Sequence, residues 1–128
     1  MKNLGVFMPS VVDLAELERL GLSLGGIAIS EKAMRFGNHP NEAYLDLNTE
    51  LSNGCFDEEE FRALINDLGF TPESYVSVHM NYSREAYLLA LKIAKSIKSR
   101  WDGEVDFSGA GGKLGAEYKA AIQSVPPS

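Results

Sequence analysis

The 128-residue chain contains a single cysteine, Cys55, and only two histidines. One thiol cannot form an internal disulfide, so the chain lacks the covalent cross-links of small secreted domains, and we expect it in the reducing cytoplasm. The histidines, His39 and His79, lie forty residues apart and show no ligand spacing with each other or with the cysteine. The sequence therefore predicts no metal site.

Long apolar runs are also missing. No stretch of 18 apolar residues occurs, and the opening MKNLGVFMPS has too few apolar residues for the core of a signal peptide. We therefore expect a soluble protein with no membrane contact that is not exported by itself. The length suits one domain with its own core, and no repeat or linker divides residues 1–128.

Basic residues are scarcer than acidic ones. The 12 Lys and Arg residues face 18 Asp and Glu residues, for a net charge of −6. Residues 1–73 contain 13 acidic and five basic residues, whereas residues 74–128 contain five and seven. An acidic surface repels phosphate backbones and attracts cations, which disfavours direct nucleic-acid binding and favours a basic protein partner. Solubility alone is the competing explanation.

Residues 75–107 show the clearest secondary-structure pattern. Residues 75–80 alternate as a half-buried strand does, and Val105 and Phe107 alternate again after a stop at Gly103. Between them, Ser83 predicts the cap of a long helix. Its apolar face repeats at spacings of three and four, through Ala86, Ala90, Ile93, Ala94, Ile97 and Trp101. This pattern predicts a strand–helix–strand crossover unit that the rest of the chain covers.

Two other helices are predicted from caps and apolar spacing. Ser10 predicts the start of a helix that ends at Gly21. Asp57 predicts the start of another that ends at Gly69, with acidic residues in its first turn. The apolar stripes expected to be buried are Val11, Leu14, Leu17 and Leu20 in the first helix, and Phe61, Leu64, Ile65 and Leu68 in the second.

The remaining elements complete the fold class. Residues 4–8 predict a first strand, residues 22–36 favour a strand with a bend at Gly25-Gly26 over a helix, and residues 43–48 predict its hairpin partner. Residues 109–128 are a glycine-rich connector and tail. The order predicts one α+β domain over residues 1–128, with a mostly antiparallel sheet and helices on one side, in a ferredoxin-like or related split sandwich.

The chain matches no sequence motif for cofactor binding or catalysis. The glycine-rich segment lacks a P-loop because Phe107 stands where a glycine is needed and Leu114 where a Ser or Thr is needed, so no cofactor is predicted. Cys55 or Ser83 with His79 would be the only nucleophile and base, and nothing nearby activates them. We therefore predict no catalytic residue and no enzyme. Charged rows on the long helix and the last strand are interpreted as solvated faces: Lys92, Lys95, Lys98 and Arg100, then Asp102, Glu104 and Asp106.

Two segments carry a resemblance. Residues 4–25, LGVFMPSVVDLAELERLGLSLG, form a short apolar strand that ends in a proline and runs into a Leu-rich helix, and residues 103–109, GEVDFSG, have the form GxxDFxG. Over residues 1–25 and 84–128 the chain resembles uncharacterised bacterial families that look like immunity proteins of polymorphic and contact-dependent growth inhibition toxin systems. The resemblance implies a small, cofactor-free, cytoplasmic protein that binds and neutralises the C-terminal domain of a cognate toxin.

A basic nuclease is the toxin type that the acidic charge favours, because carboxylates can occupy the phosphate positions of its cleft. The expected contacts are an aromatic anchor, Tyr44, and seven carboxylates: Glu42, Asp46, Glu50, Asp57, Glu58, Glu59 and Glu60. In this reading the free protein is a monomer or weak dimer. The alternative is a small-ligand-binding or enzymatic α+β domain that uses a groove near residues 108–115. A third possibility is a homodimer paired through the edge of the hairpin at residues 27–48.

Overall fold

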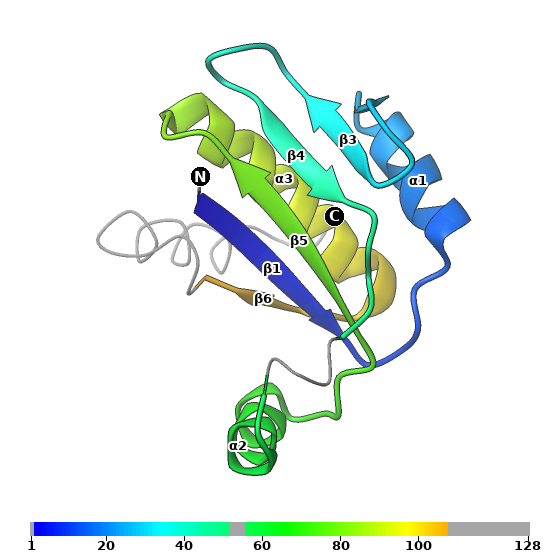
Figure 1. Cartoon of the computed structure of the whole chain (residues 1–128), viewed down its shortest axis with the longest axis vertical. Coiled ribbons are helices and arrows are strands. Elements are labelled where there is room, and N and C mark those ends of the chain that lie inside the picture. The colour runs from blue at the N-terminus through cyan, green and yellow to red at the C-terminus, as the bar shows by residue number, and fades with distance from the viewer. Residues whose placement is uncertain (1, 52–55, 108–128) are drawn as a thin grey trace.

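The structure is a computed structural model that describes residues 2–51 and 56–107. In those residues one antiparallel sheet carries helices on one of its faces (Figure 1). The elements in chain order are β1 (Lys2–Met8), α1 (Leu14–Ser23), β2 (Ile27–Ala28), β3 (Ala33–Phe36), β4 (Ala43–Asp46), α2 (Glu58–Leu68), β5 (Ser74–Met80), α3 (Arg84–Trp101) and β6 (Glu104–Asp106).

The strands lie in the order β2-β3-β4-β5-β1-β6, and every neighbouring pair is antiparallel. Because β1 lies between β5 and β6, those two strands are parallel to each other, and α3 connects them. In the same way β5 lies between β1 and β4, so those two strands are parallel to each other. Helix α1 lies in the connection from β1 to β4. Two split β-α-β units of this kind make a ferredoxin-like sheet. The hairpin of β2 and β3 extends one edge, and α2 is inserted between β4 and β5.

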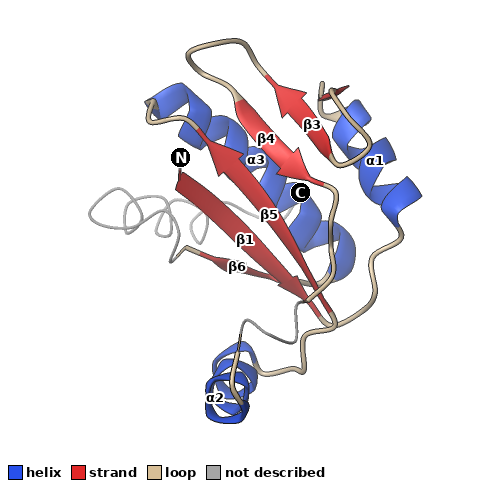
Figure 2. Ribbon diagram, viewed as in Figure 1, coloured by secondary structure: helices blue, strands red, loops and turns tan. Residues whose placement is uncertain are grey.

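The predicted α+β class and the predicted unit at residues 75–107 are therefore confirmed. The core lies between the sheet and the helices α1 and α3, which cover the same face (Figure 2). Val76, Val78 and Met80 of β5 are fully buried toward this layer. The face of α3 that covers the sheet is buried in turn, through Ala86, Tyr87, Ala90, Ile93, Ala94 and Ile97. Burial of each large side chain contributes about 1.5–3 kcal/mol.

The start and the end of α1 differ from the prediction. Asp13, not Ser10, caps the helix, and its carboxylate accepts a hydrogen bond from the amide of Ala15 at 3.0 Å. The chain must first cross from the end of β1 to the helix layer, so Val12 is buried while Val11 is 75 % exposed. The buried positions of α1 are Leu17 and Gly21, and the helix continues past that glycine to Ser23.

The predicted bent strand at residues 22–36 is instead the end of α1, through Ser23, followed by a hairpin at residues 27–36. The two-residue strand β2 follows the glycine pair and turns back into β3, where the amide of Ile29 donates to the carbonyl of Ala33 at 3.1 Å. The predicted pairing with the next strand is confirmed, with Met34 opposite Leu45. Ile27 and Ile29 alternate as expected but are exposed, because β2 lies at the edge of the sheet.

Candidate protein-binding surface

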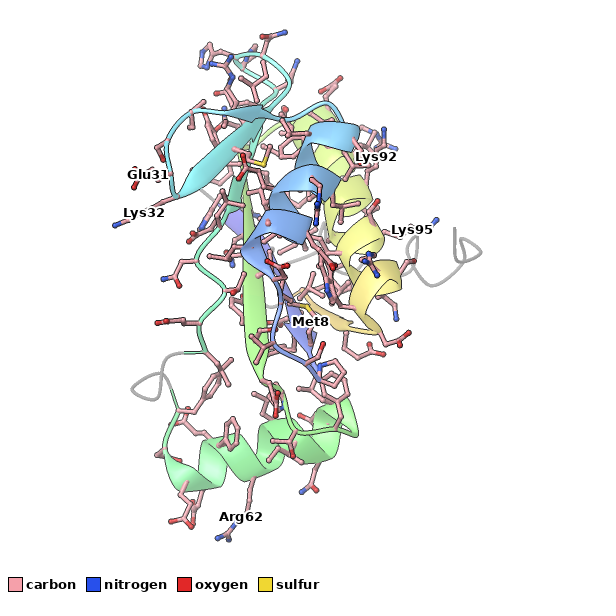
Figure 3. The ribbon with its side chains drawn as sticks, turned by 90° about the vertical axis from the view of Figure 1, so that its right-hand side faces the viewer. Met8, Glu31, Lys32, Arg62, Lys92 and Lys95 are labelled. Atoms are coloured by element: carbon pink, nitrogen blue, oxygen red, sulfur yellow. The ribbon has the colours of Figure 1, made fainter. Side chains whose placement is uncertain are left out.

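Helix α2 lies beyond the end of the sheet, apart from α1 and α3 (Figures 1 and 3). None of its residues is buried. The predicted start at Asp57 and end at Gly69 are confirmed, but the predicted buried stripe is wrong. Its four members are only partly buried, because no sheet lies under them: Phe61, Leu64, Ile65 and Leu68.

A capping box fixes the first turn of α2. The carboxylate of Asp57 accepts a hydrogen bond from the amide of Glu60 at 2.8 Å, and the carboxylate of Glu60 accepts one from the amide of Asp57 at 3.4 Å. The backbone hydrogen bond from Glu60 is the main cause that lowers the pKa of Asp57. The cap therefore holds an ionised carboxylate at the positive end of the helix.

The charge on this part of the chain is strongly negative. Residues 57–73 contain six acidic residues and one basic residue, Arg62. Arg62 pairs with Glu58 at 3.0 Å and points away from the sheet in Figure 3. Both partners are largely exposed, so this pair is weak and water competes for it. Glu59 and Glu60 are exposed beside it and give the N-terminal turn an acidic surface.

A groove of about 590 Å³ lies beside this acidic turn. Its apolar wall consists of Val11, Leu51, Phe56, Phe61 and Pro72, and the rings of the two phenylalanines lie 6.4 Å apart. Three carboxylates also line it: Asp57, Glu58 and Glu73. The groove thus combines an apolar wall with negative charge, and we call it the α2 groove.

Not all of the predicted contact residues lie near this groove. Glu50 is exposed on the connection from β4 to α2, and its backbone bridges to Ser74 at the start of β5. Asp46 ends β4, where its carboxylate accepts a hydrogen bond from the amide of Asn48 at 2.9 Å. The structure therefore gathers Glu50 and residues 57–60 at one end of the sheet.

Glu42 lies at the other end of β4, and its expected place on an exposed acidic surface is wrong. Its side chain is 8 % exposed. The carboxylate accepts a hydrogen bond from the side-chain Nδ2 of Asn81 and lies 3.2 Å from Nδ1 of His39. It therefore joins the turn before β4 to the end of β5, and a partner could reach it only by breaking these contacts.

Tyr44 lies in β4, in the middle of the sheet, and it alternates with the core residues Ala43 and Leu45, so its side chain is on the face opposite α1 and α3. It is half-buried between Arg35 and His79 of the neighbouring strands. This position is remote from α2, so Tyr44 does not belong to the α2 groove. Two aromatic residues do line the groove, and nothing local in the sequence marks Phe56 and Phe61 as only partly buried.

The same face carries a polar row that bears on the enzymatic alternative. The hydroxyl of Ser77 accepts a hydrogen bond from Asn3 at 3.2 Å and lies 3.3 Å from Nε2 of His79. Among the described residues no carboxylate orients this imidazole, so the pair lacks the third group of a hydrolytic triad. Residues 108–115 and Cys55, which the alternative also uses, lie outside the described residues.

Other charged rows are at least partly neutralised. On α3, Lys98 lies 3.6 Å from Glu104 of β6, and Arg100 lies 2.8 Å from Glu16 of α1. Within residues 2–51 and 56–107, no three metal-ligating side chains gather in one place. In the same part of the chain, no helix is both long and apolar enough to pass through a bilayer.

Comparisons of this chain with protein-family models, with curated proteins and with solved structures found no match.

Proposed function

We propose that this chain is an immunity-type protein that binds and neutralises the basic domain of a cognate toxin in the cytoplasm of the cell that makes both. The observation that carries the proposal is the exposed position of α2, which presents charge and apolar surface together. A helix of 11 residues is marginal on its own in water and usually depends on packing of its apolar face. Here that face remains partly accessible, as in helices that dock on partners.

The charge of the helix explains how such a partner would be captured. Exposed carboxylates raise the rate at which a cationic surface arrives, and they can occupy the places that phosphates take in a nuclease cleft. In this proposal Glu58, Glu59 and Glu60 make the first contacts, supported by Glu50 and Glu73 at the same end of the sheet. No group on the chain needs to perform chemistry for this activity.

The proposal expects a gene immediately upstream that encodes a large secreted protein with a basic C-terminal domain, and that domain is the candidate toxin for the test. We expect the chain to protect cells that express that domain and to bind it in solution. A triple variant, Glu58→Gln, Glu59→Gln and Glu60→Gln, should lower the association rate about tenfold at low salt, because steering contributes at least that factor. Glutamine at the last of these positions keeps the capping box, so the helix should still form.

The matched control removes the same charge elsewhere. Glu18, Glu31 and Glu85 are exposed acidic residues on α1, on the β2–β3 turn and on α3. Their change to glutamine should leave the association rate within about twofold, since these side chains lie away from the acidic turn. If the first triple variant protects cells and binds as well as the natural chain, the proposal is wrong.

A further inference from the structure

We propose, as an extension of the proposed function, that the α2 groove receives one large apolar side chain from a basic segment of the partner. Val11 lines this groove and is 75 % exposed, so its apolar side chain is accessible to a partner. Phe56 and Phe61 supply aromatic surface, and Pro72 closes the wall. The volume of about 590 Å³ is within the range of about 300–1,000 Å³ that binding pockets have.

The mixed lining specifies the chemistry of the occupant. A purely apolar segment would strip water from the carboxylates of Asp57, Glu58 and Glu73 without pairing them, which is costly. A purely polar segment would leave the apolar wall wet. A phenylalanine, leucine or methionine flanked by lysine or arginine satisfies both parts. We therefore infer that the partner presents an apolar anchor between basic residues.

The two parts of this surface then control different rates. Exposed carboxylates raise the association rate, and salt screens this effect. A buried apolar anchor lowers the dissociation rate, and salt does not screen that effect. Residues that fill a pocket near the centre of an interface usually dominate its affinity. The anchor in the α2 groove should therefore set the lifetime of the complex.

Two synthetic peptides of equal charge, KRKFKRK and KRKSKRK, test the inference on the full chain by NMR. We expect the phenylalanine peptide to shift the methyl signals of Val11 and Leu51 and the ring signals of Phe61. It should bind about tenfold more tightly than the serine peptide, the factor that corresponds to partial burial of one aromatic ring. Raising NaCl from 50 to 300 mM should weaken both peptides and preserve their ratio.

A substitution in the lining of the groove gives a second test of the inference, because it should change binding without disturbing the fold. Val11→Ser changes a residue that is already exposed, so the fold should persist, and affinity for KRKFKRK should fall about fivefold. Leu22→Ser is the control, because Leu22 is a comparably exposed apolar residue in the last turn of α1 and does not line the groove. It should leave the affinity unchanged.

Equal affinity for the two peptides, or equal effects of Val11→Ser and Leu22→Ser, would overturn the inference. Failure of KRKFKRK to bind at 50 mM NaCl would overturn it as well. Those results concern the groove alone, and protection of cells through the carboxylates would still stand. Failure of the proposed function would show differently, as full protection by the triple glutamine variant.

Discussion

Helices α3 and α2 begin and end by similar rules but differ in what they cover. In each, an N-cap side chain accepts an amide hydrogen bond three residues on, Ser83 in α3 and Asp57 in α2. In each, the C-cap residue has a left-handed backbone, Asp102 in α3 and Gly69 in α2. Yet six residues of α3 are buried against the sheet, and no residue of α2 is buried.

This difference shows that caps and apolar spacing determine whether a helix forms but not how deeply it packs. Among the described residues, α1 and α3 are the helices that cover the sheet, and they lie on the same face. Helix α2 is inserted between the adjacent antiparallel strands β4 and β5, so nothing requires it to cross the sheet. Its apolar residues are left only partly buried, and one of them, Phe61, lines the groove in which we propose that the partner binds.

The largest expected effect on stability comes from truncating an isoleucine in α3, in comparison with the same change in α2. Ile97→Ala should lower the free energy of unfolding by about 2–5 kcal/mol, because the side chain is fully buried under the sheet and its loss leaves a cavity. Ile65→Ala removes the same atoms from a partly buried position in α2, and it should leave the free energy of unfolding of the core nearly unchanged, because α2 can open without the core. Urea unfolding of both variants measures the difference.

Equal losses for the two variants would contradict the comparison, because they would place α2 inside the cooperative core. Leu88→Ala is a control within α3 itself. Leu88 lies on the exposed side of that helix, so its removal should cost far less than that of Ile97 although both are in the same helix.

Much of the fold could be predicted because its signals are local. The alternation in residues 75–80, the cap at Ser83 and the spacing of the α3 stripe each lie within one segment, and each agrees with the structure. The start of α1 could not be predicted in the same way. Ser10 and Asp13 are both good caps, and only the path of the chain from β1 to the helix layer decides between them.

The candidate surface depends still more on distant residues. Glutamate usually lies on the surface, but Glu42 is buried and accepts a hydrogen bond from the side chain of Asn81, 39 positions away in the sequence. The α2 groove takes Val11, Leu51, Phe61 and Pro72 from four separate segments, so no local pattern could reveal it. The acidic turn at residues 57–60 was predictable because a cap and its carboxylates are contiguous.

A smaller effect on stability is expected from removing the N-cap side chain of α3 or of α2. Ser83→Ala should lower the free energy of unfolding of the whole domain by about 1 kcal/mol, since α3 is part of the core. Asp57→Ala should leave the urea midpoint of the sheet unchanged and instead speed hydrogen exchange of the α2 amides several-fold, because local opening is independent of the core. A shift of the urea midpoint by the second variant as large as that by the first would mean that α2 and the core unfold together.

The smallest expected effect is the loss of α2 stability at low pH. Hydrogen bonding lowers the pKa of Asp57 in the folded state, above all through the amide of Glu60, so the fold favours the ionised carboxylate. Its contribution is therefore fully present above the unfolded value of about 3.9 and is lost as the pH falls through the lower folded pKa. We expect the α2 amides to lose protection in that range while those of α3 do not.

Asparagine also caps helices but does not titrate, so Asp57→Asn should remove the part of this pH dependence that Asp57 causes. If α2 in that variant loosens in acid as much as in the natural chain, the Asp57 carboxylate is not the cause of the response.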